Sequence, residues 1–468
     1  MNTSERNKVF IDRDKLYSLI EGKTPETKQV NEILNKALNL KGLDLEDVAS
    51  LLRVKDPEDI KRITDTALTV KEQIYGKRLV LFAPIYTGNA CINNCTYCSF
   101  RRDNKLIKRK VLSMDEIAEE TSTLLREGHK RVLLICGESK RNDTDYMVEA
   151  IRRVYSVREH DGRDYIRRIN VELAPMEVED FAKLKAEKIG TYVCFQETYD
   201  PVLYSKFHPA DTKKGNYEYR LTVMDRAMEG GINDVGIGAL LGLVDYRFEV
   251  LAIMEHARHL ERAFGCGPHT VSVPRIEYAV GAPHSENIPS PVSDSDFKKL
   301  VAIIRIALPY TGIILSTREN DAMRNELIHY GVSQISAGSR TNPGSYSHEE
   351  EQTGSQFTLG DHRTLDQVIY SLADAGFIPS FCTGCYRKGR VGQDFMDLAK
   401  PGLIKQYCMP NALFTYNEYL EDFASPQTKL AGKALIKKLV DAVENDTLKN
   451  KIADNIHSID EGKRDIYF

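Results

Sequence analysis

The 468-residue sequence has no excess of either charge, because 64 lysines and arginines face 68 aspartates and glutamates. This balance provides no basic field, so we expect neither nucleic acid nor anionic lipid as a partner. Long apolar runs are also missing. Even the stretch around Val132–Cys136 is far too short to cross a bilayer, and we expect no membrane span. Met1–Asp12 has no apolar signal-peptide core, which predicts a cytoplasmic protein.

Cysteine is scarce, and the nine that occur are not spaced like disulfide partners. A reducing compartment disfavours disulfides, so the spacing indicates metal binding instead. Cys136, Cys194 and Cys266 stand alone in apolar or loop surroundings, and we expect them to be packing residues. The other six form two triplets, and the functional prediction depends on these.

Short β-branched or apolar runs alternate with longer amphipathic stretches, a rhythm that predicts βαβ units and a parallel sheet. Eight runs are expected strands: Leu79–Ala83, Arg131–Cys136, Ile169–Leu173, Thr191–Phe195, Asp234–Leu240, Thr270–Ile276, Gly312–Ser316 and Val332–Ser336. Expected helices include Leu45–Leu52, a helix beginning at Pro57, Ser113–Glu127, Tyr217–Glu229, Tyr246–Phe264 and Asp294–Ala307.

Eight strands separated by helices predict an α/β fold with a TIM-like (β/α)8 barrel over residues 79–341. Residues 1–78 are expected to form an N-terminal helical segment. The chain turns polar and rich in Gly and Ser from Asn342 to Phe357, which indicates a boundary. Residues 342–468 are therefore predicted to be an appended C-terminal helical module that contains the second cysteine triplet.

The first triplet, Cys91-Ile-Asn-Asn-Cys95-Thr-Tyr-Cys98, follows the first expected strand, at the catalytic end of such a barrel. A 4Fe–4S cluster normally takes four cysteines, so three leave one iron with an open position, as a catalytic metal requires. Zinc is the alternative. A zinc ion would need a fourth ligand, and no cysteine or histidine near the triplet supplies one, because the next histidine is His129.

This spacing, with aromatic Tyr97 before the last cysteine, resembles the radical S-adenosylmethionine (SAM) superfamily. The resemblance implies that SAM chelates the open iron and that an electron from the cluster releases a deoxyadenosyl radical. Gly137-Glu138 stands where the superfamily often has Gly-Gly-Glu, although Cys136 replaces the first glycine. The glycine would let the backbone approach SAM and the carboxylate would accept from its ammonium; a plain strand-end turn is the alternative.

Gly236-Ile-Gly238 in the fifth expected strand offers bare backbone against which adenine could lie, with Gly238 as the contact. Strand glycines equally mark a bulge or close packing. Glu197, at the end of the fourth strand, is expected to meet SAM or the substrate, with a structural ion pair as the alternative.

The second triplet comprises Cys382-Thr-Gly-Cys385 and Cys408, all beyond the barrel. A close pair and a distant third cysteine favour a second metal site that is again one ligand short, and we expect a second 4Fe–4S cluster. Structural zinc completed by a distant histidine is one alternative. A redox Cys-x-x-Cys pair is another, although the thioredoxin-like βαβ context that it needs is missing.

Together the triplets resemble the HydG family of FeFe-hydrogenase maturases, the radical SAM tyrosine lyases. The resemblance spans nearly the whole chain, and 2-iminoacetate synthases (ThiH) share the barrel motifs but lack the second triplet. The motifs that carry it, besides the cysteines, are Phe195-Gln-Glu-Thr-Tyr199, Gly267-Pro-His-Thr-Val-Ser-Val-Pro-Arg275, Pro309-Tyr-Thr-Gly-Ile-Ile-Leu-Ser-Thr-Arg-Glu319, Ser333-Gln-Ile-Ser-Ala-Gly-Ser339 and Pro410-Asn-Ala-Leu413.

The resemblance implies that a radical breaks the Cα–Cβ bond of L-tyrosine and yields p-cresol and dehydroglycine. Dehydroglycine would cross the barrel to the second cluster and give carbon monoxide and cyanide, which bind an extra iron there for the hydrogenase cofactor. His269 is the expected protein ligand of that iron, ahead of His256 and His259. A low-potential ferredoxin or flavodoxin and other hydrogenase maturation proteins are the implied partners.

A zwitterionic amino acid needs a cation for its carboxylate. Ser316-Thr317-Arg318, at a strand end, offers a guanidinium and hydroxyls for this purpose, and Arg275 is a second candidate. For both arginines, surface or helix-facing roles are the alternative.

Some residues depart from the family pattern, namely Glu172, Glu277-Tyr-Ala-Val280 and Arg340-Thr-Asn-Pro-Gly344. They are candidates for lining the substrate pocket, so a radical SAM lyase of the 2-iminoacetate synthase type, or one for a related amino acid, is an alternative. A non-enzymatic iron–sulfur carrier or scaffold is a third hypothesis.

Overall fold

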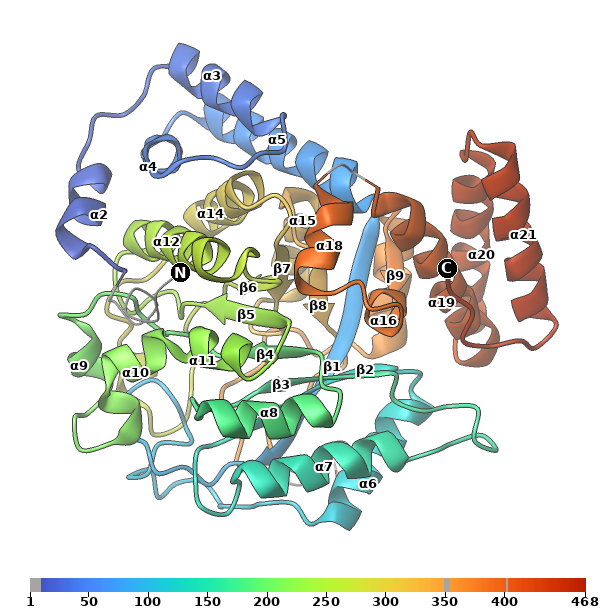
Figure 1. Cartoon of the computed structure of the whole chain (residues 1–468), viewed down its shortest axis with the longest axis horizontal. Helices are drawn as coiled ribbons and strands as arrows, with labels where there is room; N and C mark the ends of the chain where they lie inside the picture. The colour runs from blue at the N-terminus through green and yellow to red at the C-terminus, as the bar shows by residue number, and fades with distance from the viewer. Residues whose placement is uncertain (1–9, 349–353, 401–402) are drawn as a thin grey trace.

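The structure is a computed structural model that describes residues 10–348, 354–400 and 403–468. Parallel strands close into a barrel that is surrounded by helices (Figure 1). The strands are β1 (Arg78–Gly88), β2 (Arg131–Cys136), β3 (Arg168–Glu172), β4 (Thr191–Val193), β5 (Asp234–Gly238), β6 (Thr270–Ser272), β7 (Gly312–Leu315), β8 (Gln334–Ser336) and β9 (Ile378–Ser380). The predicted (β/α)8 barrel is thereby confirmed.

Helices alternate with the strands and extend beyond them at both ends of the chain. They are α2 (Arg13–Ile20), α3 (Thr27–Ala37), α4 (Leu45–Leu52), α5 (Pro57–Tyr75), α6 (Met114–Arg126), α7 (Thr144–Ser156), α8 (Val178–Ala186), α9 (Tyr204–Phe207), α10 (Tyr217–Leu221), α11 (Val223–Glu229), α12 (Tyr246–Phe264), α13 (Pro283–Glu286), α14 (Asp294–Ala307), α15 (Asp321–Leu327), α16 (Leu365–Asp374), α17 (Gly384–Arg387), α18 (Gly392–Ala399), α19 (Lys405–Asp422), α20 (Pro426–Asp441) and α21 (Asp446–Asp460). Short 3₁₀ turns cover Lys213–Gly215 and Ile328–Tyr330.

The long strand β1 closes the barrel. It pairs with β8 through Val80–Phe82 and with β2 through residues 83–88, all in parallel. Its first residues, Arg78–Val80, pair in addition with β9, which comes from the C-terminal part of the chain. The sequence analysis missed β9 because a run as short as Phe377–Phe381 with a proline inside resembles a loop.

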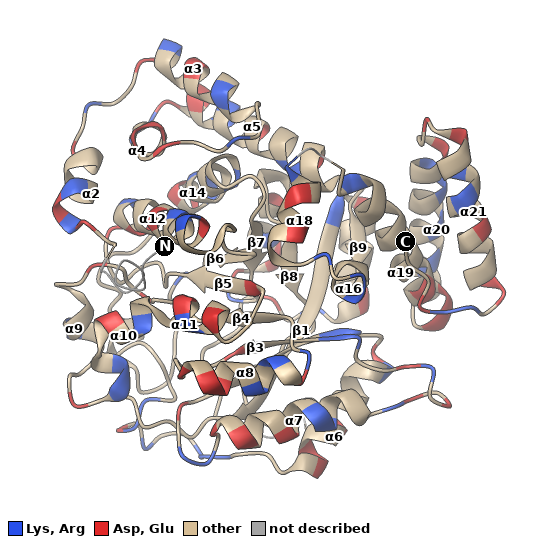
Figure 2. Cartoon of the chain, in the orientation of Figure 1, with Lys and Arg blue, Asp and Glu red and all other residues tan. Residues whose placement is uncertain are grey.

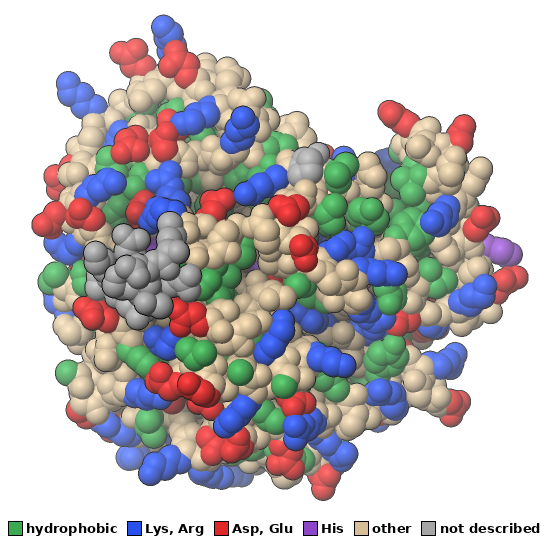
Figure 3. All heavy atoms as spheres, in the orientation of Figure 1, with side chains coloured by type: hydrophobic (Ala, Val, Ile, Leu, Met, Phe, Trp, Pro, Cys, Tyr) green, Lys and Arg blue, Asp and Glu red, His purple; other side chains and the backbone are tan. Residues whose placement is uncertain are grey.

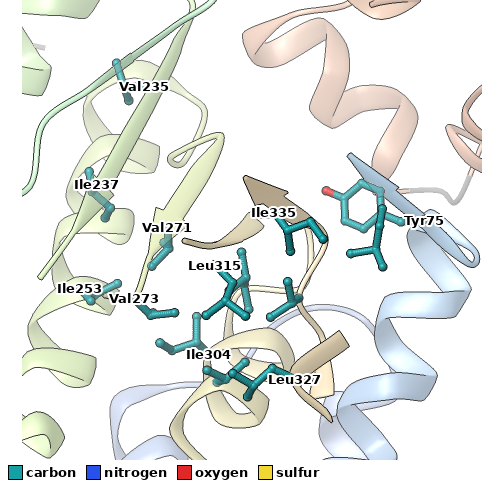
Figure 4. Close-up of a cluster of buried hydrophobic side chains, with 14 of the residues drawn as sticks. Tyr75, Val235, Ile237, Ile253, Val271, Val273, Ile304, Leu315, Leu327 and Ile335 are labelled. Atoms are coloured by element: carbon teal, nitrogen blue, oxygen red, sulfur yellow. The ribbon is translucent and has the colours of Figure 1, made fainter. Parts of the chain in front are cut away.

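The main core lies between the barrel and its helices. Figure 4 shows Val235 and Ile237 of β5, Val271 of β6 and Ile335 of β8 in this layer, together with residues of α12, α14 and α15. Because side chains alternate in a strand, these apolar residues point outward and their neighbours point into the barrel. The outward face thus stabilises the fold and leaves the inward face available for a site.

Several element ends depart from expectation for local reasons. The predicted helix Tyr217–Glu229 is divided at Thr222, whose hydroxyl donates to the carbonyl of Glu218 at 2.8 Å, a bond that bends helices. β6 ends before Pro274, which has no N–H for the sheet. The expected boundary at 342–357 contains residues 349–353, which lie outside the described residues, and the division into three parts stays a prediction.

Lys, Arg, Asp and Glu are interspersed around the outer helices (Figure 2), and the face in Figure 3 mixes both signs in the same way. This agrees with the near balance of charges in the sequence. Within the described ranges, no helix is both long and apolar enough to cross a membrane.

Lys71 of α5 is a buried amine above the ring of Phe377, 4.5 Å from its centroid. Its Nζ has no hydrogen-bond partner among the described residues, and burial lowers its pKa to about 7. The unfolded chain holds this proton up to about pH 10.5, so the site's contribution to stability rises as the pH increases from about 7 to 10.5.

We therefore predict that Lys71→Met raises the free energy of unfolding at pH 7 by about 2 kcal/mol, because a buried amine without a partner is removed. Thermal unfolding between pH 7 and pH 10 measures this, and the variant should show a flatter pH dependence than the wild type. Lys77→Met, at an exposed neighbouring position, is the matched control. An equal change in both variants would contradict the prediction.

Candidate active site

Cys91, Cys95 and Cys98 lie in the loop after β1, and all three line one cavity at the C-terminal mouth of the barrel, here called the mouth cavity. Backbone bonds hold the loop, since the N–H of Ile92 donates to the carbonyl of Glu138 at 2.7 Å. Burial and the two neighbouring thiols raise the pKa of Cys98 to about 12. A thiolate at Cys98 therefore needs a cationic partner.

The donor set fits an iron–sulfur cluster better than a single ion. No three His, Cys, Asp or Glu side chains in the described part of the chain converge tightly enough to hold one metal ion. A cubane places its thiolates on different irons, so they stand farther apart than the ligands of one zinc. The three thiols of the mouth cavity agree with that arrangement.

Gly137 and Glu138 follow β2 and line the mouth cavity. A Cβ at Gly137 would lie 2.5 Å from the carbonyl oxygen of Ala90, so only glycine lets the cysteine loop pack on the end of β2. The carboxylate of Glu138 accepts a 2.7 Å bond from Asn93 Nδ2, and Lys213 Nζ lies 3.4 Å from its other oxygen. The expected carboxylate is thus fixed beside the cysteine loop.

Glu197 and Tyr97 line the other side of the mouth cavity. Lys214 Nζ lies 2.6 Å from Glu197 Oε1 and Arg220 Nη2 lies 3.4 Å from it. Burial would raise the pKa of Glu197, but these two charges outweigh it and lower the pKa. Its φ of 73° is an uncommon backbone conformation for a residue other than glycine, as found at functional sites. Tyr97 is buried, with its hydroxyl 2.8 Å from His208 Nε2.

Arg318 is a guanidinium within the barrel that lines the mouth cavity and a second cavity beneath it, here called the middle cavity. Its carbon Cζ lies 3.4 Å from the centroid of the Phe357 ring. Among the described residues, no carboxylate forms an ion pair with it. Ser316 and Thr317 line the middle cavity beside it. An uncompensated cation flanked by hydroxyls can bind a carboxylate ligand.

Glu172 also lines both cavities, and its carboxylate makes no hydrogen bond to another described residue. Burial and then the negative charge of Glu197 raise its pKa to about 7, against the opposite effect of Arg318. Glu277 lines the mouth cavity, and burial raises its pKa as well. Two of the three departures from the family pattern therefore face the cavity, whereas Arg340 does not line it.

Two predicted site residues lie outside these cavities. A Cβ on Gly238 would approach the carbonyl oxygen of Ser272 to 2.7 Å and the ring of Phe195 to 2.9 Å, so this glycine permits close packing. Arg275 forms ion pairs with Glu319 and with Asp294, the latter at 2.7 Å. The structure thus gives Arg275 carboxylate partners of its own and does not bring it to the site.

The isolated cysteines differ in position. Cys136 and Cys194 line the mouth cavity, with Cys136 Sγ 3.8 Å from Met147 Sδ. Cys266 is buried away from the cavities.

Cys382, Cys385 and Cys408 line one cavity at the opposite, N-terminal end of the barrel, here called the lower cavity. Cys382 follows β9 after one intervening residue, Phe381, and its Sγ accepts a 3.3 Å bond from the N–H of Gly384. Hydrogen bonding with Cys385 lowers the pKa of Cys408, and the positive charges of Arg78 and Arg390 act in the same direction. The three thiols again meet in one place and fit a metal cluster.

His269 lines the lower cavity with these cysteines. Burial lowers its pKa, so the imidazole is neutral and can bind a metal. Its Nδ1 lies 3.7 Å from Asp234 Oδ1 and its Nε2 lies 3.2 Å from the hydroxyl of Tyr386. A carboxylate beside one ring nitrogen favours metal binding by the other. His256 and His259 instead contact Tyr199 and Asp225.

Several lining residues had no sequence signal. Lys214 and Arg220 reach the mouth cavity from the segment after β4, and Arg78, Arg131 and Arg390 surround the lower cavity. For Arg78 and Arg131 alone, one feature of the sequence could have indicated a role in the site: each arginine begins a buried strand.

Comparison with known proteins gives two family matches. Residues 85–257 match the radical SAM superfamily, and residues 272–378 match the biotin and thiamin synthesis associated domain. The second match extends from β6 to the start of β9.

Individual relatives cover nearly the whole chain. The sequence is 30% identical to 2-iminoacetate synthase of Salmonella typhimurium over 80% of this chain and 96% of that protein. A crystal structure of HydG, a maturase of the [FeFe]-hydrogenase, superimposes with a TM-score of 0.94 and 44% identity, covering 98% of this chain and all of that one. The X-ray structure of the FeFe-hydrogenase maturase HydG from Carboxydothermus hydrogenoformans superimposes with a TM-score of 0.82 and 40% identity, covering 97% of this chain and 100% of that one.

The carboxyl group of Glu172 should titrate near pH 7, because burial outweighs the charge of Arg318. Infrared difference spectra of the wild type minus Glu172→Gln should contain a protonated carboxyl band that disappears with a midpoint close to pH 7. In an Arg318→Gln background the midpoint should move to higher pH, since the nearby positive charge is gone. A band that is already lost by pH 5 would show that Glu172 is not in a desolvated site.

Proposed function

The chain belongs to the radical SAM lyases, in the family of the [FeFe]-hydrogenase maturase HydG, and we propose that its substrate is L-tyrosine. The Cα–Cβ bond is cleaved to give p-cresol and dehydroglycine, and dehydroglycine is converted to carbon monoxide and cyanide at a second iron–sulfur cluster. One observation carries this proposal. Two cysteine triplets lie at opposite ends of one barrel, with a cavity between them that contains an uncompensated arginine.

Family membership assigns a 4Fe–4S cluster and SAM to this enzyme. In the proposal, Cys91, Cys95 and Cys98 bind the cluster and leave one iron for SAM. The bound cofactor supplies a deoxyadenosyl radical. Glu138 and the backbone at Gly137 receive the amino end of SAM, because both line the mouth cavity beside the cysteine loop. Tyr97 and Glu197 complete this side of the pocket.

Arg318 binds the carboxylate of tyrosine, and Ser316 and Thr317 add hydroxyl contacts. Glu172 stands near Arg318 with a pKa of about 7, so it can accept a proton from the substrate's ammonium group and leave a neutral amine for hydrogen-atom removal. Arg275 is not part of this pocket. Its ion pairs with Glu319 and Asp294 occupy its guanidinium group, so it does not bind the substrate carboxylate in this proposal.

At the lower cavity, Cys382, Cys385 and Cys408 hold a second 4Fe–4S cluster in the proposal, and His269 offers its neutral imidazole to an extra iron. A low-potential ferredoxin or flavodoxin in the cytoplasm supplies electrons, and other hydrogenase maturation proteins receive the product.

A related amino acid is the second candidate substrate, and the carboxylates of Glu172 and Glu277 in the mouth cavity favour it. Release of deoxyadenosine from anaerobically reconstituted enzyme, measured with each natural amino acid, distinguishes the two. Iron-loaded protein that forms no p-cresol from tyrosine would reject tyrosine as the substrate.

Each triplet should support its own reaction. Cys95→Ser should abolish deoxyadenosine and p-cresol formation, because the first cluster loses a ligand. Cys385→Ser should keep p-cresol formation within about two-fold and block carbon monoxide release, since only the second cluster is changed. Product analysis after anaerobic reconstitution, with iron content and electron paramagnetic resonance of each cluster, measures this.

Cys266→Ser is the matched control, because Cys266 is buried but lines neither cysteine cavity. Its product yields should equal those of the wild type. Equal loss of p-cresol and carbon monoxide in Cys385→Ser would contradict the assignment of the two reactions to separate clusters.

A further inference from the structure

Small and polar residues form one sector of the barrel's inward face. Gly236 of β5 pairs with Thr270 of β6, which pairs in turn with Gly312 of β7, and Gln334 of β8 follows. Barrels of this type normally fill their interior with bulky branched side chains. Such residues flank this sector, since Val193 pairs with Gly236, and Val80 and Ile314 pair with Gln334. Within the sector the branched residues Val235, Val271 and Ile335 stand on the outward face (Figure 4), and the interior stays partly open.

Gln334 stands where two cavities meet. Of the residues that the structure describes, it alone lines both the middle and the lower cavity, and 8% of its surface is exposed. Its carboxamide makes no hydrogen bond to any other described residue. A Cβ on Gly312 would lie 2.7 Å from Gln334 Nε2, so glycine at 312 leaves the space that the amide occupies.

A second polar group beside this amide also has no partner. Thr270 lines the middle cavity and is 2% exposed, and its Oγ1 has no hydrogen-bond partner among the described residues. A buried hydroxyl without a partner is costly, so its retention indicates that something else bonds to it. On the far side, Nε of Arg131 in the lower cavity is likewise buried without a partner within the described ranges.

The two sides of this sector differ in charge. The mouth cavity is lined by charges of both signs, with Glu197 paired to Lys214 and Arg220. The lower cavity is lined by the guanidinium groups of Arg78, Arg131 and Arg390 and, among the described residues, by no carboxylate. A small anion in the barrel is therefore attracted toward the second triplet.

We propose that Gln334, with Thr270 and Gly312, forms a polar constriction that passes the two-carbon imino acid and retains the aromatic product. The inference rests on the proposed tyrosine cleavage. Dehydroglycine is small, and its carboxylate and imine can bond to the amide, the hydroxyl and then the arginines in sequence. The ring of p-cresol is wider and would leave these groups without partners, so it departs through the mouth.

The experiment uses anaerobically reconstituted full-length enzyme and measures p-cresol, carbon monoxide, cyanide and glyoxylate together. Dehydroglycine that does not pass the constriction reacts with water to give glyoxylate and ammonia. The amount of glyoxylate therefore measures how much dehydroglycine is blocked. Gln334→Leu should lower carbon monoxide and cyanide about five-fold relative to p-cresol, the factor expected for one lost buried hydrogen bond. Glyoxylate should rise by the matching amount, with p-cresol unchanged.

Three further variants keep the result interpretable. Gly312→Ala should act like Gln334→Leu, because its methyl pushes the amide into the passage. Gln334→Asn keeps a polar group in a wider opening and should retain carbon monoxide formation. Gln196→Leu removes another buried glutamine, 3% exposed, whose carboxamide has no partner among the described residues either but which lines none of the three cavities. Its products should equal those of the wild type.

Unchanged ratios of carbon monoxide to p-cresol in both Gln334→Leu and Gly312→Ala would overturn the proposed constriction. Loss of p-cresol in Gln334→Leu but not in Gln196→Leu would overturn it as well, because Gln334 would then serve the first reaction. The second cluster's paramagnetic signal and iron content must stay at the wild-type level, and their loss would assign Gln334 to cluster binding instead. Absence of p-cresol from the wild type would instead reject the tyrosine cleavage on which the inference rests.

Discussion

Closure of the parallel sheet by β1 is the constraint on which the rest of the structure depends. Because β1 pairs with both β2 and β8, the interior is enclosed, and its two ends differ in character. Loops that follow the strands form one end, and the first residues of the strands form the other. The loop after β1 places Cys91, Cys95 and Cys98 at the first end. The additional pairing of β1 with β9 brings Cys382 and its partners to the second.

Electrostatics divides the interior in the same way. At the mouth, the carboxylate of Glu197 is balanced by Lys214 and Arg220, while burial and the negative charge of Glu197 keep the pKa of Glu172 raised. At the other end, arginines surround the thiols, and burial lowers the pKa of His269 and keeps its imidazole neutral. The proposed radical chemistry on an amino acid and the proposed metal chemistry on its fragment need such different surroundings.

Much of the fold could be predicted from the sequence, because it follows from local patterns. Runs of apolar residues predict the positions of eight strands, and the helical periodicity of apolar residues predicts helices such as Tyr246–Phe264. The cysteine triplets could be predicted for the same reason, because the spacing of the cysteines along the chain is by itself typical of iron–sulfur sites. Lys214, Arg220 and Arg390 could not be predicted, because they reach the cavities only through tertiary packing. Arg275 illustrates the converse. The sequence offers it as a ligand for the substrate carboxylate, but it lies beyond the end of β6 and pairs with Glu319, and no sequence pattern indicates that pairing.

The hydrogen bonding of β9 to β1 has a consequence for how the two ends of the barrel communicate. A segment that shares a sheet with the first strand cannot swing as a carrier domain does, so the distance between the two sets of thiols is fixed by backbone geometry. Among the described residues, no tethered arm joins the two ends. An intermediate of the two proposed reactions must therefore travel as a diffusing small molecule, and the enclosed interior would protect it from water.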